Sequence, residues 1–110
     1  MTNYIHFEDM IKEGNLLCAK YIDPVGFEKK KDRAGFAESL HYHEDYLFLI
    51  PVIEKIEFED EPEIRFVMYP DECQVQRLEG DGFFHTLLTY NSESRIKSAF
   101  GAVHLYLKNK

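Results

Sequence analysis

Three short runs of alternating apolar and polar residues, separated by two tight-turn sequences, occupy the stretch from residue 64 to residue 90. The runs lie at about 64–69, 73–79 and 83–90. Tyr69-Pro70-Asp71-Glu72 and Gly80-Asp81-Gly82 separate them, and both suit tight turns, because proline presets φ and glycine accepts a positive φ. Connections this short join neighbouring strands in antiparallel order. The pattern therefore predicts a three-stranded antiparallel meander.

Helical periodicity flanks the meander on both sides. Apolar residues recur every three or four positions over about 4–22, 45–58 and 93–108. Asp45 is the expected N-cap of the second helix, and Ser92 or Ser94 that of the third. Pro51 predicts a kink or a tightened first turn, because proline lacks the amide proton of a helix interior. Gly14 and Asn15 leave open a break in the first helix, because glycine disfavours a helix interior. Asn15 would then cap a second short helix.

Residues 24–39 show no clear period and are rich in glycine and charge, so they predict mostly loop, with a short strand near 25–28. No internal repeat is apparent in the chain. A three-stranded antiparallel sheet has an apolar face to cover, and amphipathic helices are available to cover it. The economical architecture is a two-layer α+β fold, with the meander packed against the helices. We expect residues 1–110 to form one domain, since that length buries a sufficient core.

The charge and the length of the apolar runs in the chain argue against two classes of partner. It carries 20 acidic and 13 basic residues, a net charge of −7. Proteins that bind nucleic acid cluster lysine and arginine on one face, so no nucleic-acid partner is expected. The one basic run, EKKKDR at 28–33, contains its own acids and is typical of a solvated loop. No apolar run approaches the ~20 residues of a membrane span, so no membrane partner is expected either.

The two cysteines, Cys18 and Cys73, stand far apart and form no Cys-x-x-Cys pair. The N-terminal residues show no basic-then-apolar signal pattern. Lone thiols in such a chain indicate buried, reduced side chains and a cytoplasmic location. Reactive thiols would need a basic environment, and no cluster of basic residues surrounds either cysteine in the sequence.

Residues 40–45, LHYHED, are the stretch most like a chemical site. His41 and His43 are two positions apart, and an extended chain would point both rings the same way, toward a metal ion shared with Asp45 or His85. On a helix the two rings would point apart. In the structural alternative, Asp45 caps the helix and His43 packs beneath its end. The metal site requires residues 40–43 to be extended and a third ligand to come from another element.

Motifs of catalysis are otherwise missing from the sequence. It contains no Gly-x-Ser-x-Gly, no glycine-rich phosphate loop and no cysteine close to a histidine in a known arrangement. Paired carboxylates are expected by chance in an acidic chain. The sequence therefore favours a non-enzymatic protein without a cofactor, and it leaves enzymatic activity open.

Residues 42–57, YHEDYLFLIPVIEKIE, resemble a stretch of a family of small bacterial and phage proteins, Tyr-His-x-Ser-Trp-Asp-Trp-Leu-Met-Pro-Val-Val-Glu-Lys-Ile-Glu. The matching positions are Tyr42, His43, Leu49, Pro51, Val52, Glu54, Lys55, Ile56 and Glu57. Tyr46 and Phe48 stand where the family has tryptophan. Residues 15–22 and 94–110 are similar to the family's preceding and closing helices. The resemblance implies this helical layout and an association with phages or mobile elements, and it implies no activity.

The first of three function hypotheses is a small, non-enzymatic module that binds a protein partner or a second copy of itself. Its basis is that a three-stranded sheet leaves two edges and that the chain is rich in aromatic residues. The second is a metal-binding protein or metal-dependent enzyme that uses His41 and His43. The third is an acidic inhibitor that mimics DNA, which requires carboxylates aligned along one face.

Overall fold

The computed structural model describes residues 7–110 and has an α+β architecture, as the sequence predicts. Its helices are α1 (Phe7–Ile22), α2 (Pro24–Glu28), α3 (Arg33–Glu38), α4 (Tyr46–Glu54), the π-helix η1 (Lys55–Asp60) and α5 (Arg95–Lys108). Its strands are β1 (Ile64–Met68), β2 (Glu72–Leu78) and β3 (Phe84–Asn91), paired antiparallel in the order β1-β2-β3. The predicted meander is therefore confirmed. Of the first predicted helix, residues 4–6 lie outside the described residues.

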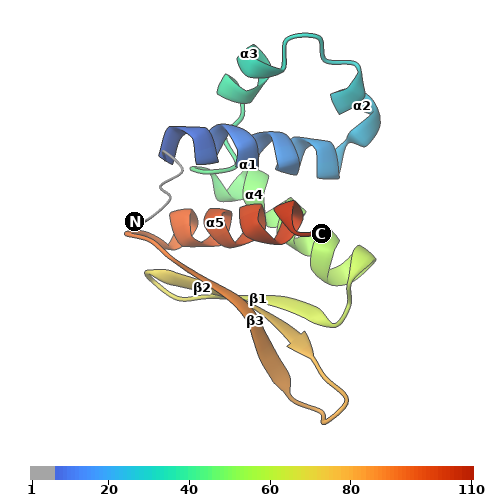
Figure 1. Ribbon diagram of the computed structural model, residues 1–110, viewed down its shortest axis with the longest axis vertical. Coiled ribbons are helices and arrows are strands. Elements are labelled where there is room, and N and C mark those ends of the chain that lie inside the picture. The colour runs from blue at the N-terminus through green and yellow to red at the C-terminus, as the bar shows by residue number, and fades with distance from the viewer. Residues whose placement is uncertain (1–6) are drawn as a thin grey trace.

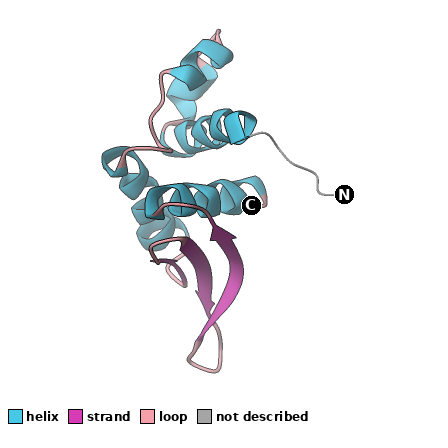
Figure 2. Ribbon diagram, turned by 90° about the vertical axis from the view of Figure 1, so that its left-hand side faces the viewer, coloured by secondary structure: helices cyan, strands magenta, loops and turns pink. Residues whose placement is uncertain are grey.

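The helices cover one face of the sheet, and the helical layer is two helices deep (Figures 1 and 2). Helix α5 lies against all three strands, and η1 packs beside β1. Helix α1 packs on α5, on the side away from the sheet, and α2 and α3 lie at the far end of the molecule (Figure 1). Within residues 7–110, no helix has the length and apolar character needed to cross a membrane.

The sheet buries alternate side chains of its first two strands against α5. Ile64 and Phe66 of β1, and Cys73 and Val75 of β2, are all buried. They join side chains of α1, α4 and α5 in one hydrophobic core. Strand β3 contributes least, because most of its side chains are exposed.

Helix α1 runs unbroken through Gly14 and Asn15, so the break that the sequence left open does not occur. Gly14 instead marks a close approach of two helices. A Cβ atom at Gly14 would lie 2.4 Å from Cζ of Phe100 in α5. Asn15 is buried in the middle of the helix rather than at a cap.

The prediction of loop over residues 24–39, with a strand near 25–28, is wrong. Two short helices form there, and each begins with an aspartate that accepts a hydrogen bond from a glycine amide three residues later. The distance is 3.0 Å both for Asp23 with Gly26 and for Asp32 with Gly35. Helices of five and six residues show no period, but their side-chain caps stabilise them locally.

The second predicted helix, at 45–58, is divided into α4 and η1. Asp45 is its N-cap, as predicted, and accepts a 2.9 Å hydrogen bond from the amide of Leu47. Pro51 lies inside α4, and the wider π-helix turns begin four residues later. Ser94, one of the two predicted caps, caps α5 by accepting a hydrogen bond from the amide of Lys97.

Candidate binding pocket

The His-x-His segment forms a turn rather than the extended chain that a metal site requires. The carbonyl of His41 accepts hydrogen bonds from the amides of Glu44, at 3.2 Å, and of Asp45, at 3.0 Å. The two imidazole rings consequently lie in different surroundings. His41 is exposed, whereas His43 packs edge-on against Phe100, with 5.9 Å between ring centroids.

Glu44, which the sequence analysis did not select, is the carboxylate nearest to both histidines. One of its oxygens lies 2.6 Å from Nδ1 of His41, and the other lies 3.7 Å from Nε2 of His43. Asp45 is engaged as a helix cap, and His85 pairs with Asp81 in the β2–β3 hairpin, at 2.8 Å.

The four predicted ligands are therefore not brought together. Among the side chains that the structure describes, those of residues 9–110 without Ala34, no group of three or more from histidine, cysteine, aspartate and glutamate is arranged to hold a metal ion. Metal binding stays a prediction. Metal analysis of the wild type and of His43→Ala would decide it.

Asn15 fixes the protonation state of His43. The backbone amide of Tyr42 can only donate, and it donates to Oδ1 of Asn15 at 3.0 Å. Nδ2 of Asn15 therefore donates to Nδ1 of His43, also at 3.0 Å, so that ring nitrogen carries no proton. Burial lowers the pKa of His43, and the neighbouring Glu44 opposes this shift only in part. The arrangement holds the turn before α4 against the middle of α1.

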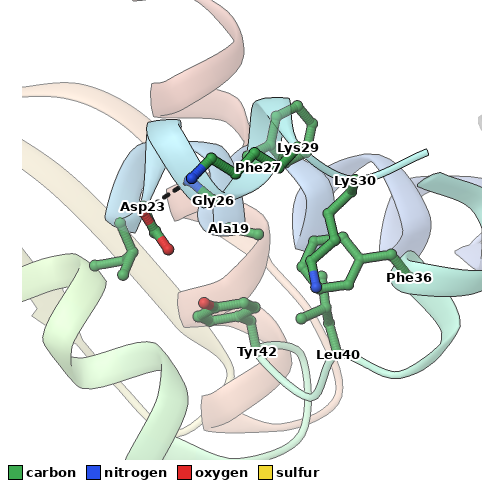
Figure 3. A pocket seen from close by; sticks show the side chains of 10 residues that line it. Ala19, Asp23, Gly26, Phe27, Lys29, Lys30, Phe36, Leu40 and Tyr42 are labelled. Carbon is green, nitrogen blue, oxygen red and sulfur yellow. Dashed lines mark hydrogen bonds between the residues drawn. The ribbon is translucent and has the colours of Figure 1, made fainter. Parts of the chain in front are cut away.

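A pocket of about 420 Å³ opens beside this turn, between α1, α2 and α3 (Figure 3). Its apolar walls are Ala19, Ile22, Phe27, Phe36, Leu40 and Tyr42. In Figure 3, Tyr42 and Leu40 lie across the pocket from Phe27, and Phe36 lies at one end with Lys30. Burial raises the pKa of the Tyr42 hydroxyl above its usual value. Among the polar residues at the pocket, the Asp23 carboxylate is already bound to the amide of Gly26.

A short sequence repeat builds the pocket. Asp-Pro-Val-Gly-Phe at 23–27 and Asp-Arg-Ala-Gly-Phe at 32–36 share the pattern Asp-x-x-Gly-Phe. In each copy the aspartate caps the helix through the glycine amide, and the following phenylalanine lines the pocket. A Cβ atom on either glycine would lie within 2.5 Å of the capping carboxylate, so a larger residue at either position would require the aspartate side chain to move. The repeat contradicts our prediction that the chain contains none.

The phenylalanine of each repeat is in contact with a cation, one from the second repeat and one from the segment between the repeats. The guanidinium of Arg33 lies 4.5 Å from the ring centroid of Phe27, and Nζ of Lys30 lies 4.8 Å from that of Phe36. Cation–π contacts at sites open to solvent on the cation's side are worth about 0.5–1 kcal/mol. They hold the two short helices together at the mouth of the pocket. Among the ion pairs of the described side chains (residues 9–110 without Ala34), none involves Lys29 or Lys30, so no described carboxylate neutralises either ammonium group.

An exposed apolar strip on α4 and η1 adjoins the pocket. Ile22 lines the pocket and also a second hollow that it shares with Pro51 and Phe58. On the outward side of the same helical segment, Leu47 is 84% exposed and Phe58 is 75% exposed. We call Leu47, Pro51 and Phe58 the α4 strip.

The two cysteines lie elsewhere and are unreactive. Cys18 and Cys73 are fully buried and free, as the sequence predicted for buried thiols. Burial raises the pKa of each thiol to about 12, so neither forms the thiolate that nucleophilic chemistry needs.

Comparison with known proteins adds no family. No protein-family model, no curated protein and no solved structure matches this chain. The resemblance of residues 42–57 to small bacterial and phage proteins therefore stays a prediction, and the site is interpreted from its geometry.

Proposed function

We propose that this protein is a protein-binding module, and that its pocket receives an apolar side chain of the partner. The observation that carries the proposal is the pocket itself, which two Asp-x-x-Gly-Phe repeats line with aromatic rings. Pockets that anchor a protein partner are lined mostly by apolar side chains and are supported by rigid backbone. The side-chain caps supply that rigidity.

The surroundings of the pocket favour a protein over a small molecule. Through Ile22 the pocket continues toward the α4 strip, where Leu47 and Phe58 expose most of their apolar surface. Contiguous exposed apolar surface is characteristic of protein–protein contact sites. A partner segment that anchors one side chain in the pocket would cover the α4 strip with its neighbouring residues.

Charge indicates the chemistry of that segment. Lys29 and Lys30 are at the pocket, and neither forms an ion pair with a carboxylate among the side chains that the structure describes. The rest of the chain is acidic. We therefore expect the partner to present an aromatic or large aliphatic side chain with a carboxylate nearby, since opposite charges at the rim favour association.

A displayed library of random peptides tests the proposal. We expect the wild type to enrich peptides that contain an apolar anchor beside aspartate or glutamate, and Phe36→Ala to lose them. Phe83→Ala is the matched control, because Phe83 is 71% exposed in the β2–β3 hairpin and the same atoms are removed away from the pocket. Enriched peptides that bind both variants equally, or a wild type that enriches none, would contradict the proposal.

A further inference from the structure

The two edges of the sheet differ in whether their backbone groups are engaged. At the β1 edge, the amide of Ile64 donates to the carbonyl of Glu61 at 2.9 Å. The amide of Phe66 donates to a carboxylate oxygen of Glu57 at 2.8 Å. Both donors come from the side of β1 that faces away from β2, so the chain itself closes this edge.

The hydrogen bonds at the two ends of β3 show which of its residues face β2. The amide of Ser92 donates to the carbonyl of Asp71 at 3.0 Å, and the amide of Glu79 donates to the carbonyl of Phe83 at 2.9 Å. In an antiparallel pair, hydrogen-bonded and non-hydrogen-bonded positions alternate along the strand. Counting inward from each end, the backbone groups of residues 85, 88 and 90 face β2.

The backbone groups of Phe84, Thr86, Thr89 and Asn91 therefore face away from β2. Among the hydrogen bonds of residues 7–110, none engages the backbone N–H or C=O of these four residues on that side. An edge strand with free backbone groups is a template for a further strand. The β2–β3 hairpin projects from the molecule away from the helices, which leaves this edge accessible (Figure 1).

A bulge makes the outward pattern symmetric. Val75 pairs with Leu88 and Gln76 pairs with Thr86, so Leu87 is an extra residue in β3. The outward positions are consequently 84, 86, 89 and 91, which are symmetric about the midpoint between Leu87 and Leu88. A partner strand without a bulge presents backbone groups at every second residue. If it paired with one half of β3, its groups would be out of step with those of the other half.

We propose that a second copy of this chain pairs with β3, antiparallel, about a two-fold axis between Leu87 and Leu88. A second copy has the same bulge and hence the same spacing of outward groups, so every outward position meets a counterpart. Thr86 then lies opposite Thr89 of the second copy, and Phe84 lies opposite Asn91 of the second copy. Such an interface is isologous and closes at two chains.

The side chains of β3 permit this pairing. The strand contains no aspartate, glutamate, lysine or arginine, although the chain carries a net charge of −7. No like charges are therefore placed opposite each other across the axis. Because the two molecules repel each other at longer range, added salt is expected to strengthen the dimer.

Charge substitutions at the threonine pairs test both the dimer and its register. In light scattering or sedimentation, we expect the wild type to show twice the mass of one chain. T86K/T89K and T86E/T89E place like charges at both pairs, and each is expected to weaken the dimer roughly tenfold or more. An equimolar mixture of the two variants places lysine opposite glutamate and is expected to form dimers again.

T86K/T89E is the matched control, since it carries the same number of substitutions but places opposite charges at both pairs. It is expected to dimerise without a partner. Phe36→Ala, in the pocket, is expected to leave the dimer unchanged, which separates this interface from the proposed function. A wild type that remains a single chain at millimolar concentration, or like-charge variants that dimerise as strongly as the wild type, would overturn the proposal.

Discussion

At the scale of residues, Asn15 determines how the candidate pocket is supported. Its side chain accepts from the amide of Tyr42 and donates to His43, so one buried amide connects α1 to the turn before α4. Tyr42 lines the pocket, and Phe48 packs edge-on against it at 6.0 Å between ring centroids. A buried polar group that is fully hydrogen-bonded specifies one arrangement of its neighbours.

The burial of His43 makes stability depend on pH. The folded protein favours the neutral form of His43, because burial lowers the pKa of the ring below its unfolded value of about 6.5. His43 therefore contributes stability above pH about 6.5, and the contribution decreases as the pH falls through the folded pKa. We expect the free energy of unfolding to decline between pH 7 and pH 5, as measured by chemical denaturation.

His43→Gln is the control for this pH dependence, because glutamine retains polar atoms but does not titrate. Its stability is expected to be flatter over the same range. The carboxyl groups whose pKa the fold lowers, such as those of Glu13 and Glu44, lose their contributions only under more acidic conditions. A wild type whose unfolding free energy is as independent of pH as that of the variant would show that His43 is not the cause.

At the scale of elements, the closeness of α1 to α5 depends on Gly14. In an ordinary helix interior, replacing glycine with alanine stabilises by about 1 kcal/mol. Here the added methyl group would overlap the Phe100 ring and separate the two helices. Overpacking of a core costs about 1–3 kcal/mol, so the clash outweighs the gain in propensity.

Gly14→Ala is therefore expected to lower the free energy of unfolding, by up to about 2 kcal/mol. Gly80→Ala is a suitable control, because no atom beyond its two chain neighbours lies within 4 Å of the Cβ position at Gly80 in its exposed turn. Thermal unfolding followed by circular dichroism compares the two variants. A Gly14→Ala variant as stable as the wild type would mean that α1 and α5 pack more loosely.

The strands and helices also show how much of the fold the sequence could predict. The three strands and the helix caps at Asp45 and Ser94 depend on local alternation and local hydrogen bonds, and they were found to within one or two residues. Helices α2 and α3 were missed because they are shorter than two turns and show no period. The signal for both helices was the Asp-x-x-Gly-Phe repeat at 23–27 and 32–36. Each copy contains the capping aspartate and the glycine whose amide donates to it.

The pocket and the role of Glu44 could not be predicted, because they depend on tertiary structure. Ala19, Phe27, Phe36 and Tyr42 come from separate segments, and only the packing of the short helices on α1 brings them together. The His-x-His spacing drew attention to the histidines, but the turn at 41–45 directs their rings toward different neighbours.

At the scale of the whole molecule, the two proposed contact surfaces lie at opposite ends. The pocket is formed by α1, α2 and α3, and the open strand edge belongs to the hairpin beyond the sheet (Figure 1). A dimer through β3 would therefore leave both pockets accessible. Two pockets in one assembly would bind a partner with repeated motifs more tightly than one pocket would.

The central claim, that the pocket accepts an apolar side chain, is tested most directly by amide NMR spectra recorded with increasing p-cresol, a mimic of a tyrosine side chain. We expect the largest shifts at the amides of Gly26, Phe27, Gly35 and Phe36, which surround the pocket. Phe36→Ala should reduce the shifts at the first two, whereas Phe83→Ala should not. Shifts that are largest away from the pocket, or that are unchanged in Phe36→Ala, would contradict the claim.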